Sequence, residues 1–177
     1  MKTRTIKSGI AGLAIIASCL TANAFAAPKP DSAAEACFAK IKSLAGDWYM
    51  KDDKGKETLA LRYRVTSGGS TVEEAIFPGQ PHEMISMYHM EGGSLAMTHY
   101  CAVGNQPHMK ATASSTPAKI VFDCAGVGNS KSHDDMHMHH AVITPKDSKH
   151  LLTEWSSLSG GKPGMAAKFD VYRKDTK

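Results

Sequence analysis

Residues 84–101 read MISMYHMEGGSLAMTHYC, and the fold is decided in this stretch. Two runs rich in apolar and aromatic residues flank Gly92-Gly93, a pattern that is typical of a β-hairpin. A loop with an even number of residues fixes which side chains face each other across the two strands. The pairs expected for an even loop are Met90 with Leu95, Tyr88 with Met97, and Ser86 with His99.

One face of this hairpin is more continuously apolar than the other, and we expect it to point into the fold. A loop of three residues would reverse this assignment, because successive side chains alternate between the two faces of a strand. The residues expected inside are Met84, Ser86, Tyr88, Met90, Leu95, Met97, His99 and Cys101.

Short strand-like runs of the same kind continue along most of the chain, separated by turns rich in glycine, proline and asparagine. Many short strands with short connections indicate an antiparallel meander, and closing the meander removes its exposed edges. The predicted fold is therefore all-β, an up-and-down antiparallel β-barrel. The expected strands are 57–65, 70–77, 83–90, 94–103, 107–113, 118–124, 136–144, 149–157 and 167–173.

One short N-terminal helix precedes the strands. Ser32 and Glu35 have the spacing of a capping box, and Gly46 is placed to end the helix. An apolar stripe at helical spacing gives this helix one face to bury. The stripe consists of Cys37, Phe38, Ile41 and Leu44.

Residues 1–26 have the three-part layout of a secretory signal peptide: a basic start, an apolar stretch, and a small-residue cleavage pattern that ends at Ala26. Lipidation at Cys19 is an alternative, because residues 16–19 resemble a lipobox. The chain is thus expected to divide into a signal peptide (1–26), a linker with the helix (27–46) and one barrel domain (47–177), located in the periplasm, secreted, or anchored by lipid in the envelope.

The charge balance changes when the signal peptide is removed. The chain has 21 Lys and Arg against 17 Asp and Glu, and three of the basic residues precede the expected cleavage, so the mature balance is 18 − 17 = +1. A nearly neutral surface without a basic block argues against nucleic acid or an anionic membrane as the main partner. We expect a monomer that is not inserted in a membrane after processing.

Two positions suggest how the barrel is closed at its base. Gly46-Asp47-Trp48 resembles the Gly-x-Trp signature of lipocalins and other calycins, and Arg173 resembles the arginine that packs over that tryptophan. A cation over an indole ring is a favourable contact. The resemblance assigns Trp48 and Arg173 a structural role.

A wider resemblance covers most of the chain after the helix. Segments that include Tyr63 to Gly69, Tyr88-His89, Thr98 to Cys101 and Gly104 to Pro107 are similar to a bacterial family of small secreted calycin-like proteins. This resemblance implies the barrel and no activity.

The leading functional hypothesis is a binding barrel that holds a small hydrophobic molecule in its cavity. Polar side chains inside and at the rim would orient the ligand, and the Asn105-Gln106 turn carries two amides for this purpose. The candidate ligand-binding residues are Tyr88, Met97, His99, Cys101, Asn105, Gln106 and Trp155.

A second hypothesis rests on residues 133–140, which read HDDMHMHH. His137 and His139 alternate onto one face of the expected strand, so both imidazoles could reach one metal ion, with His99 as a further candidate ligand. Thioethers from Met109 or Met97 would suit copper, and zinc or haem with His99 or His139 as the axial ligand are alternatives.

Two cross-strand pairs are predicted for the later hairpin, with residues 145–148 as its loop. His139 would lie opposite Glu154, and Met138 opposite Trp155. A histidine that faces a carboxylate is either a structural pair or support behind a ligand.

A third hypothesis is an enzyme that uses His99, Cys101 or Glu83, but the sequence contains no complete catalytic motif, and no catalytic residue is assigned. The cysteines Cys37, Cys101 and Cys124 allow at most one internal disulfide bond. An expected strand at 107–113 separates Cys101 from Cys124, which favours Cys37 as the partner of one of them.

Overall fold

A computed structural model describes residues 32–132 and 134–174. The expected signal peptide, Cys19 and His133 lie outside the described residues. The described elements are α1 (Ser32–Ser43), β1 (Gly46–Lys51), β2 (Glu57–Thr66), the 3₁₀ turn η1 (Ser67–Gly69), β3 (Thr71–Ile76), β4 (Met84–Glu91), β5 (Ser94–Tyr100), β6 (Gln106–Ala111), β7 (Ile120–Gly128), β8 (His137–Pro145), β9 (His150–Ser159) and β10 (Lys162–Tyr172).

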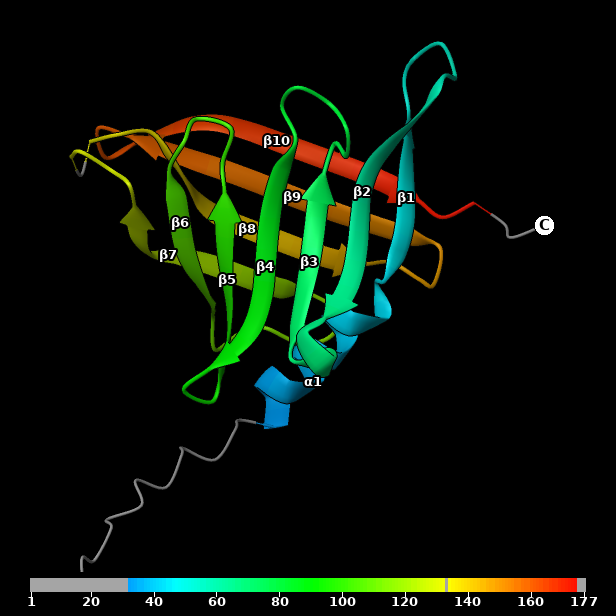
Figure 1. Cartoon of the computed structure of the whole chain (residues 1–177), viewed down its shortest axis with the longest axis horizontal. Helices are drawn as coiled ribbons and strands as arrows, with labels where there is room; N and C mark the ends of the chain where they lie inside the picture. Colours follow the sequence, from blue (N-terminus) through cyan, green and yellow to red (C-terminus); the bar gives the residue numbers. More distant parts are fainter. Residues whose placement is uncertain (1–31, 133, 175–177) are drawn as a thin grey trace, which may run out of the picture.

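The ten strands form one closed antiparallel up-and-down barrel, in which each strand pairs with its neighbours in sequence and β10 closes onto β1 (Figure 1). This confirms the predicted fold class. Bulky side chains fill the interior, and Tyr63, Tyr88, Met97, Met109 and Phe122 are almost completely buried. Within the described residues, no helix has the length and hydropathy needed to cross a membrane.

The β4–β5 hairpin has the predicted register. Tyr88 pairs with Met97 and Ser86 with His99, because the hairpin turns at Gly92 and Gly93 with φ of 57° and 86°. Left-handed φ values at both positions suit glycine and match the twist of the strands. Ser86, Tyr88, Leu95, Met97 and His99 are all buried, as expected for the inner face.

The predicted register of the β8–β9 hairpin is wrong by three residues. Ala141 pairs with Trp155 and Val142 with Glu154, so neither His139 nor Met138 lies where it was expected. Asp147 accepts hydrogen bonds from the backbone N–H groups of Lys149 and His150, in a turn where five residues separate the last paired positions, Pro145 and Leu151.

The helix α1 lies across one end of the barrel (Figure 1). It buries Cys37, Phe38 and Ile41 against the strands. The expected disulfide bond from Cys37 is not formed, since Cys101 and Cys124 both carry free thiols.

Trp48 and Arg173 join the helix to the barrel. Trp48 is buried and donates from Nε1 to the carbonyl of Leu44 at 2.8 Å, while the Arg173 guanidinium lies 4.4 Å from its ring centre, as predicted. Arg173 Nη2 also donates to the carbonyls of Ser43 and Ala45, each at 3.0 Å. These carbonyls belong to the end of the helix, where partners within the helix are missing.

We predict that Arg173→Ala lowers the free energy of unfolding in urea by roughly 1–3 kcal/mol, because it removes a cation–π contact and leaves two carbonyls without their donor. The control is Arg64→Ala, which removes an exposed ion pair with Glu73. That change is expected to cost at most about 1 kcal/mol. Equal losses in the two variants would contradict the role given to Arg173.

Candidate functional site

A chain of buried polar side chains crosses the barrel interior. Glu74 is completely buried and accepts hydrogen bonds from Tyr63 at 2.5 Å and Tyr88 at 2.6 Å. Burial raises the pKa of Glu74, although the hydrogen bonds from Tyr63, Tyr88 and Ser86 oppose this shift. Burial and the nearby Glu74 carboxylate raise the pKa values of both tyrosines. These groups are therefore held in place by each other.

His99 extends this network of buried polar side chains through a contact with Ser86. Its Nδ1 is 3.0 Å from the Ser86 hydroxyl, and its ring is 4.9 Å from the ring of Trp155. Burial lowers the pKa of His99 to about 4, so the imidazole is neutral at physiological pH. The side chain is only 2% exposed. His99 is thus part of the packed interior.

The predicted ligand-binding residues separate into two groups. Tyr88, Met97, His99 and Trp155 are buried inside the barrel, so a ligand placed among them would have to displace well-packed side chains. The remaining three, Cys101, Asn105 and Gln106, lie in or beside the β5–β6 turn.

Asn105 connects the β5–β6 turn to the segment just before β8. Its Nδ2 donates to the carbonyl of Met136 at 2.7 Å, just before β8, and the side chain is buried. Its Oδ1 has no hydrogen-bond partner among the described residues. Gln106 turns away to donate to the carbonyl of Gly104 at 3.0 Å. The two amides therefore stabilise the β5–β6 turn and its contact with the segment before β8.

The pairing between β7 and β8 stops part-way along both strands. Within the described residues the last pair is Asp123 with His140, although β7 continues to Gly128 and β8 begins at His137. His140 Nδ1 and the Asp123 carboxylate, 2.6 Å apart, mark this point. Beyond it, the facing stretches of β7 and β8 form a seam without ladder pairs.

Two β-bulges flank this seam. In β7, His108 pairs with Gly126 and Met109 with Cys124, which leaves Ala125 as the extra residue. In β8, Met138 and His140 pair with consecutive residues of β9, which leaves His139 extra. A bulge changes the direction of side chains and is common beside functional sites.

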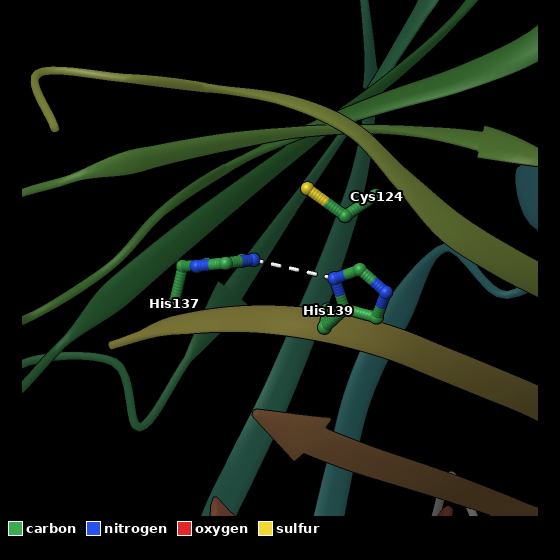
Figure 2. Close-up of side chains that lie close together, drawn as sticks. All are labelled: Cys124, His137 and His139. Carbon is green, nitrogen blue, oxygen red and sulfur yellow. Dashed lines mark hydrogen bonds between the residues drawn. The ribbon is translucent and has the colours of Figure 1, made fainter. Parts of the chain in front are cut away.

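Three potential metal ligands meet at the seam: Cys124 from β7, and His137 and His139 from β8 (Figure 2). One ligand atom of each residue lies within 4.8 Å of the others, and all three residues are partly buried. His137 Nε2 is 3.2 Å from His139 Nδ1. A tetrahedral zinc ion with Zn–N distances of about 2.0–2.1 Å holds two nitrogens ~3.3 Å apart, so the imidazoles are spaced for one ion.

The tautomer of the neutral His137 ring follows from its second contact. His137 Nδ1 lies 2.9 Å from the backbone carbonyl of Asp135, and a carbonyl only accepts, so Nδ1 carries the proton. Nε2 of the neutral ring then accepts a hydrogen bond from His139 Nδ1, and the proton of His139 must move to its Nε2 before both facing nitrogens can bind one ion. A backbone carbonyl behind the imidazole is the usual support of a metal-binding histidine.

Cys124 completes the group as a thiol whose pKa is raised by burial. Its Sγ lies 3.4 Å from the carbonyl of Gly126. A cation at this point would favour the thiolate and release the proton, which is why metal binding by cysteine depends on pH. The group can therefore hold a cation with one thiolate and two neutral imidazoles.

The sequence predicted only part of this group. The structure brings His137 and His139 together, but His99 lies inside the barrel and Met97 is buried there too. Met109 is the cross-strand partner of Cys124 and is buried. The sequence suggests Cys124 only as a disulfide partner, because its position beside the histidines depends on a register that the sequence pattern does not show.

The residues of the enzyme hypothesis are not assembled. Glu83 lies just before β4, where its carboxylate accepts from the backbone N–H of Gly79 at 2.7 Å. His99 contacts Ser86 and Trp155 instead, as described above. Cys101 lies at the rim after β5.

Comparisons with known protein families and with curated proteins found no match for this chain.

We predict that acid destabilises the protein partly through His99. Its pKa is about 4 in the folded state and 6.5 as the reference value, so the unfolded chain binds more protons between these values. The free energy of unfolding should therefore fall as the pH drops from 7 to 4, by roughly 2–3 kcal/mol from this residue alone. The measurement is urea unfolding across this pH range.

His99→Gln should be less sensitive to acid than the wild type over the same range, whatever its stability at pH 7. His82→Gln, at an exposed position, should keep the wild-type dependence. The interpretation is wrong if His99→Gln and the wild type lose the same free energy between pH 7 and pH 4.

Proposed function

We propose that this barrel binds a transition-metal ion, zinc or copper, at Cys124, His137 and His139. The observation that carries the proposal is that the three ligand atoms come from two strands and lie within 4.8 Å of one another. The β-bulges and the carbonyl behind His137 support it, because they orient the side chains without a bound ion. We name these three residues the seam site.

The type of ligand determines which metals fit. A thiolate and imidazoles suit zinc and copper, whereas calcium and magnesium require oxygen ligands. No acidic residue belongs to the seam site. Zinc and copper are therefore the ions to test first.

A hydrophobic ligand in the interior receives less support from the packing. The side chains of Tyr88 and Met97 have no exposed surface, and Trp155 covers the ring of His99. A haem with His99 as its axial ligand would need to displace Trp155, whose ring centre lies 4.9 Å from that of the imidazole. The seam site needs no such rearrangement, since its three residues are already partly accessible.

The proposed role includes location outside the cytoplasm, which rests on the sequence of residues 1–26. In that setting the seam site would sequester or carry metal ions of the envelope. Cysteine in an oxidising compartment is protected when it is bound to metal, because the thiolate is then a ligand.

We predict that the reduced, metal-free protein binds one Zn²⁺ or Cu⁺ per chain, measured by competition with a chromophoric chelator. Cys124→Ser and His137→Ala should each weaken binding by at least ~100-fold, because each removes one of three direct ligands, and even supporting residues cost 10–100-fold.

The matched controls are Cys101→Ser and His82→Ala, which change the same residue types away from the seam site. Both should keep the wild-type affinity. Failure of the wild type to bind either ion, or equal affinities in the Cys124 and Cys101 variants, would overturn the proposal.

A further inference from the structure

A cleft of about 560 Å³ opens directly beside the seam site. Its wall includes all three ligands, and it is further lined by Val127, Lys131 and Leu158. This volume falls in the range of about 300–1,000 Å³ that is usual for small-molecule sites. The cleft is thus large enough for a ligand in addition to the metal ion.

We propose that the cleft binds a small organic anion, whose carboxylate or similar group occupies a coordination position of the metal ion. This inference rests on the proposed metal binding. The described residues supply three protein ligands, and zinc sites with three protein ligands keep a fourth position for water or substrate. That position would face the cleft, because the ligands form one of its walls.

Charge favours an anion in this cleft. A divalent ion with one thiolate and two neutral imidazoles carries a net charge of +1, and Lys131 adds a second positive charge. None of the described residues that line the cleft is acidic. Asp135 is one of the carboxylates near the ligands in sequence, and its Oδ2 accepts from the backbone N–H groups of Lys131 and Ser132 at 2.7 Å and 3.2 Å.

The Asp135 carboxylate therefore shapes the loop that carries Lys131. The Ser130 hydroxyl also donates to it at 3.2 Å. These bonds hold the loop at the edge of the cleft.

The apolar wall indicates which anions fit. Val127 and Leu158 are both partly exposed on the cleft, from β7 and β9. An apolar group beside the anionic group would cover these side chains and remove apolar surface from water. The expected ligand class is a small carboxylate with an apolar body, in preference to an inorganic anion.

The experiment uses the Co²⁺-loaded protein, whose visible absorption reports the coordination of the ion. Titration with acetate and with benzoate should shift the bands saturably, with benzoate binding more tightly than acetate. Lys131→Gln should weaken both anions by roughly two- to fivefold, the effect of one exposed charge. Leu158→Ala should weaken benzoate more than acetate, because only benzoate reaches that wall.

Lys119→Gln is the matched control, since Lys119 is exposed on the connection between β6 and β7, outside the cleft. It should leave both affinities unchanged. A wild type that takes up no Co²⁺, Zn²⁺ or Cu⁺ overturns the proposed function and this inference together. A Co²⁺ spectrum that neither anion alters, or equal anion affinities in the Lys131 and Lys119 variants, overturns this inference alone.

Discussion

The structure depends on a sheet whose backbone hydrogen bonds run around a closed circuit. Each of the ten described strands pairs on both sides, so no strand presents a free edge along its whole length. Unpaired backbone groups are costly in a buried setting, and closure satisfies them without a second sheet. Closure also forces alternate side chains inward, where they must fill the barrel. At the seam, the pairing of β7 and β8 ends at Asp123 and His140, before either strand does.

The packed interior contains a carboxyl group that would be costly alone. Glu74 is tolerated because Tyr63 and Tyr88 donate to both of its oxygens, and Ser86 connects it to His99. A satisfied polar network makes one arrangement of the side chains better than the others. This network of buried polar side chains thus specifies how the strands pack. The seam site lies where the pairing between β7 and β8 ends.

The sequence predicted the architecture well because local patterns control it. Gly92-Gly93 set the β4–β5 register, and the Trp48–Arg173 contact followed from a resemblance. Strand β1 (Gly46–Lys51) is not among the expected strands, the first of which begins at residue 57. The β8–β9 register failed because Asp147 builds a longer turn from side-chain hydrogen bonds, which apolar periodicity does not report.

The candidate site was predictable only in its histidines. Alternation along one strand is a local property, so His137 and His139 could be assigned to one ion from the sequence. Cys124 lies beside them because β7 and β8 each contain a bulge and because their pairing stops early. Both features depend on how neighbouring strands pair. A contact between strands that depends on irregular pairing produces no periodic pattern in the sequence of either strand.

The same irregularity would give the proposed metal binding a structural consequence. Cys124 belongs to β7 and the two histidines to β8, so an ion held by all three joins the strands where ladder hydrogen bonds are missing. A ligand that binds the folded state and not the unfolded chain stabilises the fold by mass action. An ion bound at the proposed seam site would therefore connect β7 and β8 where their backbone pairing has ended.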